Sequence, residues 1–173
     1  MRRWTWIVLI AIVVAAAAVD RAVQRREFDA LVTASVVAAD VVDAWTAARD
    51  AFLADLEPSA GYGAGPRNAG RADVFRRLTE KRFVGELAAA RDAVATTSVM
   101  PWHLATSRAR AAYLAHLGAW TDRLDGVVRS VAAVTVPFPA IPETRAQACG
   151  RLHSAVPWGG GVQAGDLDRI CAD

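Results

Sequence analysis

Residues 113–134 read YLAHLGAWTDRLDGVVRSVAAV, and this stretch decides the fold class. Steps of four and three residues alternate along it, and they connect Tyr113, Leu117, Trp120, Leu124, Val127, Val131 and Val134. Such spacing places the large side chains on one face of an α-helix. Because proline suits the first turn of a helix, Pro101 indicates the start, and the helix is predicted over about 101–134.

Two more long helices are predicted before this one. The first covers about 21–57 and ends at Pro58, and its inward side chains are interrupted only by Arg49. Its inward candidates are Phe28, Leu31, Ser35, Ala38, Val42, Trp45, Phe52 and Leu56. A glycine-rich loop is expected over 58–70, and a second helix with a rougher pattern over 71–97. Its inward candidates are Val74, Phe75, Leu78, Phe83, Leu87, Ala90 and Val94.

The C-terminal region, residues 136–173, is rich in proline and glycine. The prolines of VPFPAIP favour extended chain directly after Thr135, and a short helix is predicted around 143–154. A second glycine-rich loop follows, and residues 166–171 are expected to form a last helical turn. No segment alternates convincingly with a period of two. The chain is therefore predicted to be all-α, with an antiparallel three-helix or four-helix bundle over 21–135 and a C-terminal cap.

The first 20 residues predict a membrane segment. Trp4–Val19 reads WTWIVLIAIVVAAAAV and contains no charged residue. As a helix it would be about 24 Å long, which is short for a bilayer core of about 30 Å, although flanking arginines can close the gap. Trp4 and Trp6 stand where interfacial aromatic residues are common. Two interpretations stay open: an uncleaved signal anchor, or a signal peptide cleaved near the run Ala15–Ala18.

Charge distribution separates the N-terminus from the rest of the chain. Residues 1–26 contain five arginines and one aspartate, a net charge of +4, whereas residues 27–173 contain 15 basic and 17 acidic residues. The folded part therefore has no positive field that would attract nucleic acid. Arginine outnumbers lysine nineteen to one and alanine is frequent, which is typical of high-GC bacterial genomes.

Cys149 and Cys171 are the only cysteines, and a disulfide between them is predicted to hold the C-terminal tail. Closing the loop between the two cysteines contributes on the order of 3 kcal/mol to the free energy of unfolding in the chain-entropy model. A metal site with His153 is the alternative, but no second pair of ligands has suitable spacing. An even cysteine pair and an N-terminal export segment place the C-terminal domain outside the cytoplasm, with the N-terminus inside, or secrete the protein if the segment is cleaved.

No motif for catalysis, cofactor binding or metal binding is found in the sequence. No motif pairs His103 or His116 with a nucleophile or an orienting carboxylate. His116 shares a helix face with Trp120, and the loops carry Tyr62 and Trp158 as exposed aromatic candidates. These five residues, Tyr62, His103, His116, Trp120 and Trp158, are the candidate ligand or partner contacts.

The leading functional hypothesis is a membrane-anchored, extracytoplasmic interaction or scaffold protein of the bacterial cell envelope, without catalytic activity. It would contact the membrane through Trp4–Val19 and bind a protein partner. A bundle that binds or senses a small ligand near Trp45, Tyr113 and Trp120 is the alternative. An enzyme that depends on His103 or His116 is the second alternative.

Overall fold

The protein is described by a computed structural model over residues 2–56, 66–157 and 164–171. Its elements in chain order are α1 (Arg2–Ala54), α2 (Pro66–Leu78), the π-helix η1 (Thr79–Phe83), α3 (Val84–Thr96), α4 (Leu104–Arg129), the 3-10 helix η2 (Val131–Thr135), α5 (Ala140–Ala155) and α6 (Ala164–Cys171). These described residues contain no β-strand, so the predicted all-α class is confirmed. Tyr62 and Trp158 lie outside the described residues.

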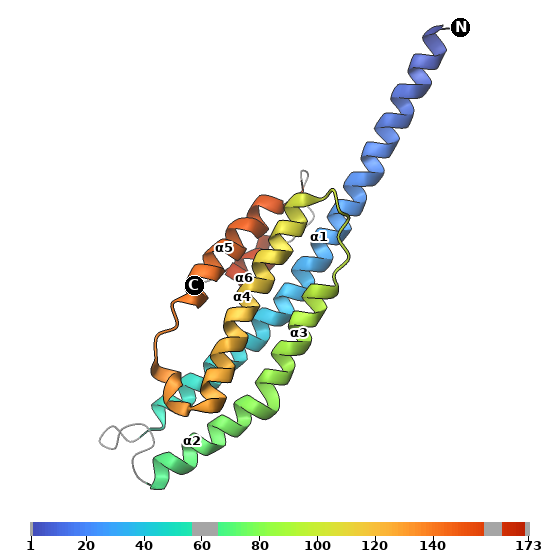
Figure 1. Cartoon of the computed structure of the whole chain (residues 1–173). Helices are drawn as coiled ribbons and strands as arrows, with labels where there is room; N and C mark the ends of the chain where they lie inside the picture. The colour runs from blue at the N-terminus through green and yellow to red at the C-terminus, as the bar shows by residue number, and fades with distance from the viewer. Residues whose placement is uncertain (1, 57–65, 158–163, 172–173) are drawn as a thin grey trace.

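Helix α1 is one uninterrupted helix of 53 residues. Its C-terminal part lies in the bundle, whereas its N-terminal part projects freely beyond it (Figure 1). An 18-residue window of the projecting part has a mean hydropathy of 2.2 and no buried residue. Within the part of the chain that the structure describes, α1 is the one helix long and apolar enough to cross a membrane.

The bundle is built from four antiparallel helices, α1, α3, α4 and α5. Helix α3 packs against α1 and α4, and α5 packs along α4 on the other side (Figure 1). The short helix α6 contacts both α1 and α5. The four-helix form of the predicted bundle is therefore the one observed, because the C-terminal region supplies α5, a helix of 16 residues, as a partner for α4.

The core follows the predicted stripe of α1 closely. Phe28, Leu31 and Trp45 are at most 2% exposed. Ser35, Ala38 and Phe52 are also buried, and Val42 and Leu56 are half-buried. The stripe is wide because α1 has neighbours on more than one side, as its contacts with α3, α4 and α6 demonstrate.

The predicted inward face of the second helix was wrong at two positions. Val74 is 68% exposed and Leu78 is 37% exposed, whereas the neighbouring Thr79 is fully buried. The buried residues of this region are Ala72, Phe75, Thr79, Phe83, Leu87, Ala90 and Val94. From Phe75 to Leu87 the buried residues are spaced four residues apart three times in a row. A regular α-helix has about 3.6 residues per turn, so it cannot keep side chains with this spacing on one face. The wider turn of η1 absorbs the extra residue, so the register before it differs from the register after it.

The boundaries around the prolines also differ from the predictions. Helix α4 begins at Leu104 instead of 101 and ends at Arg129 instead of 134, because Ser130 is extended. Val134 is nevertheless fully buried, since η2 folds back onto the bundle. Helix α5 starts at Ala140, within the segment that was expected to be extended. Pro142 is tolerated there because the first turn of a helix needs no backbone N–H donors.

Arg123 stabilises this turn and was not identified from the sequence. Its side chain is only 8% exposed, and its guanidinium donates hydrogen bonds to the carbonyl oxygens of Val134 at 2.7 Å and Val136 at 2.8 Å. Both acceptors belong to the chain between α4 and α5, whose carbonyls have few helical partners. The arginine therefore fixes the reversal that brings α5 alongside α4.

Candidate functional site

The predicted disulfide is present and holds α6 in place. Cys149 in α5 is bonded to Cys171, the last residue of α6, with Cα atoms 5.8 Å apart. Helix α6 buries Leu167 and Ile170 against the core. Because the sulfur of Cys149 is committed to this bond, it offers no thiolate with which exposed His153 could bind a metal.

His103 is at the centre of a polar cluster that the sequence did not reveal. Its Nδ1 atom lies 2.6 Å from Oε2 of Glu27, and its Nε2 atom lies 3.2 Å from Oδ1 of Asp20. The Trp102 indole donates a 2.9 Å hydrogen bond to the same Asp20 oxygen, and Oε1 of Glu27 accepts one of 2.8 Å from the backbone N–H of Met100. We call these five residues the clasp. It fastens the chain before α4 to the point where α1 enters the bundle.

The electrostatics of the clasp favour a charged imidazole. Burial by itself lowers the pKa of His103, but hydrogen bonds to Glu27 and Asp20 and the charges of these carboxylates outweigh it, so the pKa is raised from its usual 6.5. Hydrogen bonds from Trp102 and His103, together with the His103 charge, lower the pKa of the Asp20 carboxyl. Since both ring nitrogens contact carboxylate oxygens, the arrangement suits a clamp better than a general base.

His116 has the opposite environment. It is 7% exposed, and its Nδ1 atom lies 3.1 Å from the hydroxyl of Thr144, which donates to the Ala140 carbonyl at 2.6 Å. The hydroxyl therefore accepts from the ring, which assigns the proton to Nδ1. Burial, with the nearby Arg145 charge, lowers the pKa of His116 to about 4. This histidine is neutral at pH 7.

A cavity of mixed polarity lies beside His116. It has a volume of about 330 Å³ and is lined from α1, α4, α5 and α6. Its main polar and aromatic lining residues are Asp43, Arg49, Tyr113, His116, Trp120, Arg145 and Arg169. Two of the five predicted contacts, His116 and Trp120, thus meet here, together with Tyr113 from the small-ligand alternative. Trp45 contacts the Trp120 ring edge-on at 5.7 Å but is almost fully buried and does not line this cavity.

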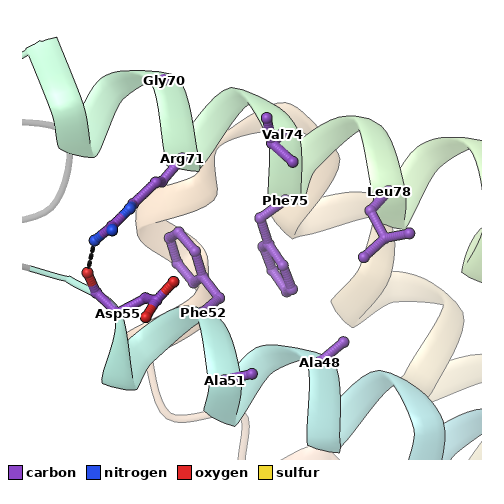
Figure 2. Close-up of a pocket in the computed structure, with 9 residues that line it drawn as sticks. All are labelled: Ala48, Ala51, Phe52, Asp55, Gly70, Arg71, Val74, Phe75 and Leu78. Carbon is purple, nitrogen blue, oxygen red and sulfur yellow. Dashed lines mark hydrogen bonds between the residues drawn. The ribbon is translucent and has the colours of Figure 1, made fainter.

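A second hollow, which we call the α1–α2 groove, lies at the opposite end of the bundle from the projecting N-terminus (Figure 1). Its volume is about 560 Å³, and it is lined by Ala48, Ala51, Phe52, Asp55, Gly70, Arg71, Val74, Phe75 and Leu78. Figure 2 shows the rings of Phe52 and Phe75 side by side between the two helices, stacked with centroids 4.6 Å apart.

The α1–α2 groove is mostly apolar and closed at one end by a polar contact. The guanidinium of Arg71 donates to the backbone carbonyl of Asp55, as the dashed line in Figure 2 marks. Val74 and Leu78 line the groove because the register change at η1 turns them away from the core. The only signal in the sequence was their apolar character, which the helical pattern assigned to the core instead.

Comparisons of the chain with protein-family models, with curated proteins and with solved structures find no match in any of the three.

Proposed function

We propose that this protein is a membrane-anchored, extracytoplasmic interaction or scaffold protein of the bacterial cell envelope, which presents the α1–α2 groove to a partner protein. The observation that carries the proposal is the arrangement along α1. A free apolar segment occupies one end of this continuous helix, and an open apolar groove lies beside its other end.

The anchor is supported by the exposure of the apolar segment Trp4–Val19. Its large apolar side chains are exposed; Ile10 is 60% exposed and Val13 is 66% exposed. Leaving so many large apolar side chains in water is unfavourable by roughly 25 cal/mol per Å², whereas a bilayer would cover them. The Cys149–Cys171 disulfide supports placement of the bundle in an oxidising compartment, with the N-terminus on the cytoplasmic side.

The α1–α2 groove suits an apolar helix face of a partner. Its stacked phenyl rings form an apolar floor, and exposed Val74 and Leu78 extend it at the side of α2. A volume of about 560 Å³ is enough for several large side chains. Docking of an amphipathic helix into such a groove is a common recognition mode, in which apolar anchors supply most of the affinity.

The test uses the full chain, tagged at its C-terminus, in native membranes. Val74→Arg places a charge in the groove at a position that is already 68% exposed, so the fold is expected to survive. Val37→Arg is the matched control, because Val37 is 52% exposed on α1 and does not line the groove. After detergent solubilisation, a partner that copurifies with the wild-type and Val37→Arg chains is expected to be lost from Val74→Arg. An unchanged set of copurifying proteins would contradict the proposal.

Binding of a small ligand in the cavity beside His116 is the second candidate. The observation that favours it is the meeting of Arg145, Arg169 and a neutral histidine around about 330 Å³ of space. Such a lining suits an anionic molecule with an apolar part. A thermal-shift screen of small carboxylates tests it: a hit should raise the melting temperature of the wild type but not of Arg145→Gln. Without any hit, the cavity would have no ligand of this class.

A further inference from the structure

The clasp places an exposed tryptophan level with the end of the apolar segment. Trp102 belongs to the connection between α3 and α4, yet its indole N–H is bonded to Asp20 at 2.9 Å. Asp20 directly follows Val19, the last residue of the uncharged run. A residue 82 positions away in sequence therefore lies at the depth where the apolar segment ends.

This end of the bundle exposes more apolar surface than the bond to Asp20 requires. Trp102 is 63% exposed, Leu104 is 56% exposed and Met100 is 38% exposed, although all three are large apolar side chains. They share the end of the bundle from which the N-terminal part of α1 emerges (Figure 1). Water is a poor environment for such a group of side chains, and no described element covers them.

Exposed basic side chains lie on α1 and α4 at this end of the bundle. Arg21 and Arg26 are exposed on α1 just beyond Asp20, and Arg108 is exposed on α4 one turn after Leu104. Asp20 and Glu27 contact His103, whereas Asp29 is exposed on α1 three residues after Arg26. Exposed apolar side chains and arginines at the same end of the bundle suit the head-group layer of a bilayer, where phosphates lie above the first methylenes of the lipid chains.

The length of the apolar segment puts the lipid boundary at the same depth. Sixteen helical residues span about 24 Å, which is less than the bilayer core of about 30 Å. The edge of the hydrocarbon therefore falls within a few Å of Asp20. Tryptophan is the residue most characteristic of this zone, since its ring is apolar and its N–H needs a polar acceptor. Trp4 and Trp6 occupy the other end of the segment, so Trp102 would complete the pair of aromatic belts.

The clasp makes this placement rigid. Glu27 accepts from the backbone N–H of Met100 at 2.8 Å and contacts the His103 ring at 2.6 Å, so the residues on both sides of Trp102 are fastened to α1. The connection between α3 and α4 is therefore not free to withdraw the tryptophan from the bilayer surface.

We propose that the connection between α3 and α4, together with the first residue of α4, is a second membrane contact, in which Trp102 and Leu104 insert into the head-group layer of a phospholipid bilayer. This inference rests on the proposed anchoring by α1 and extends it. The bundle then contacts the membrane at two places, so its orientation does not depend on α1 alone. Asp55 directly follows α1, 35 residues after Asp20. With α1 along the bilayer normal it lies about 50 Å from the surface, so the α1–α2 groove is far from the lipid.

The test measures depth in the bilayer with the full chain in vesicles of phosphatidylcholine and phosphatidylglycerol. Single cysteines are introduced by Leu104→Cys, Val74→Cys and Ile10→Cys and labelled with an environment-sensitive fluorophore. The native cysteines do not react, because they are joined in the disulfide. Phospholipids brominated at a shallow or a deep acyl position serve as quenchers. Ile10 reports on the anchor, and Val74, which is 68% exposed in the α1–α2 groove, is the control in water.

The expected result is strong quenching at Ile10 by deep bromine, quenching at Leu104 by shallow bromine, and none at Val74. Adding Trp102→Ala to the Leu104-labelled chain should reduce its quenching by at least half. Quenching at Ile10 with a Leu104 signal equal to that of Val74 would overturn the second contact and leave the anchor intact. The absence of quenching at both Ile10 and Leu104 would overturn the anchor and the second contact together.

Discussion

The Nδ1 atom of His103 lies 2.6 Å from Oε2 of Glu27, and the two residues are 76 positions apart in sequence. Both side chains are buried, with exposed fractions of 4% and 8%. The contact joins the residue before α4 to the part of α1 where the helix enters the bundle. A buried pair of this kind is costly to break, because the remaining partner is left desolvated and unpaired.

The His103 contact is expected to lose its stabilising effect in alkaline solution. The pKa of His103 is raised above the unfolded value of 6.5 by its two carboxylate partners, against the effect of burial. The contribution is therefore complete below about pH 6.5 and is lost as the pH rises through the higher pKa of the folded state. Thermal unfolding of the full chain in detergent micelles, followed by circular dichroism from pH 6 to 9, measures it.

His103→Gln tests the assignment of this pH dependence. We expect it to destabilise the protein at pH 6.5 by about 1–3 kcal/mol, because it leaves buried Glu27 without its charged partner. The alkaline loss of stability should be much smaller in this variant. His153→Gln, at an exposed position in α5, serves as the control and should follow the wild type. Parallel pH profiles for His103→Gln and the wild type would contradict the prediction.

His116 is expected to cause a loss of stability in acid. Its pKa is about 4 in the folded state, chiefly through burial, and 6.5 is the unfolded value. Between these values the unfolded chain binds more protons, so stability falls as the pH decreases from about 6.5 to 4, by at most about 3 kcal/mol. His116→Gln should flatten this acid limb in the same unfolding experiment. An acid limb as steep as that of the wild type would exclude His116 as its origin.

Reduction of the Cys149–Cys171 disulfide is expected to release α6. The loss of the crosslink costs on the order of 3 kcal/mol in the chain-entropy model, so the melting temperature should fall. The double variant Cys149→Ser, Cys171→Ser should match the reduced wild type. Alkylation of freshly isolated membranes without reductant should modify neither cysteine. Rapid labelling of both thiols under these conditions would refute an oxidising location for the bundle.

Arg123→Met is expected to destabilise the turn between α4 and α5. The variant keeps most of the aliphatic volume but removes the hydrogen bonds to the Val134 and Val136 carbonyls. Two lost bonds from a charged donor predict a decrease of about 2–4 kcal/mol in the free energy of unfolding. Arg91→Met, at an exposed site on α3, is the control and should change stability little. Equal melting temperatures for the two variants would disprove the role of Arg123.

The long helices and the core of α1 were predictable because their signal is local. Phe28, Leu31 and Trp45 recur at helical spacing, and this spacing alone puts them on the buried face. The face of α2 was not predictable in the same way. The π-turn at η1 changes the register, and buried Thr79 within it accepts a 3.3 Å hydrogen bond from Trp45 of α1. That bond is a tertiary contact, which no count of residues within α2 reveals.

The candidate sites show the same division. Tyr113, His116 and Trp120 could be placed on a shared helix face, but the arginines that line the cavity with them come from α1, α5 and α6. Val74 and Leu78 line the α1–α2 groove because the change of helical register at η1 places them outside the core. The boundaries near Pro142 were missed because proline fits a first helical turn as readily as extended chain, and the sequence does not distinguish the two.

The amino-acid sequence by itself determined the helical class, the apolar N-terminal segment and the pairing of Cys149 with Cys171. Periodicity, hydropathy and cysteine count are properties of neighbouring residues or of composition, so they can be read without a fold. Only the tertiary structure decided that His103 meets Glu27 and that Trp102 meets Asp20. These contacts depend on how the chain before α4 packs against α1, and that packing is the outcome of the whole core.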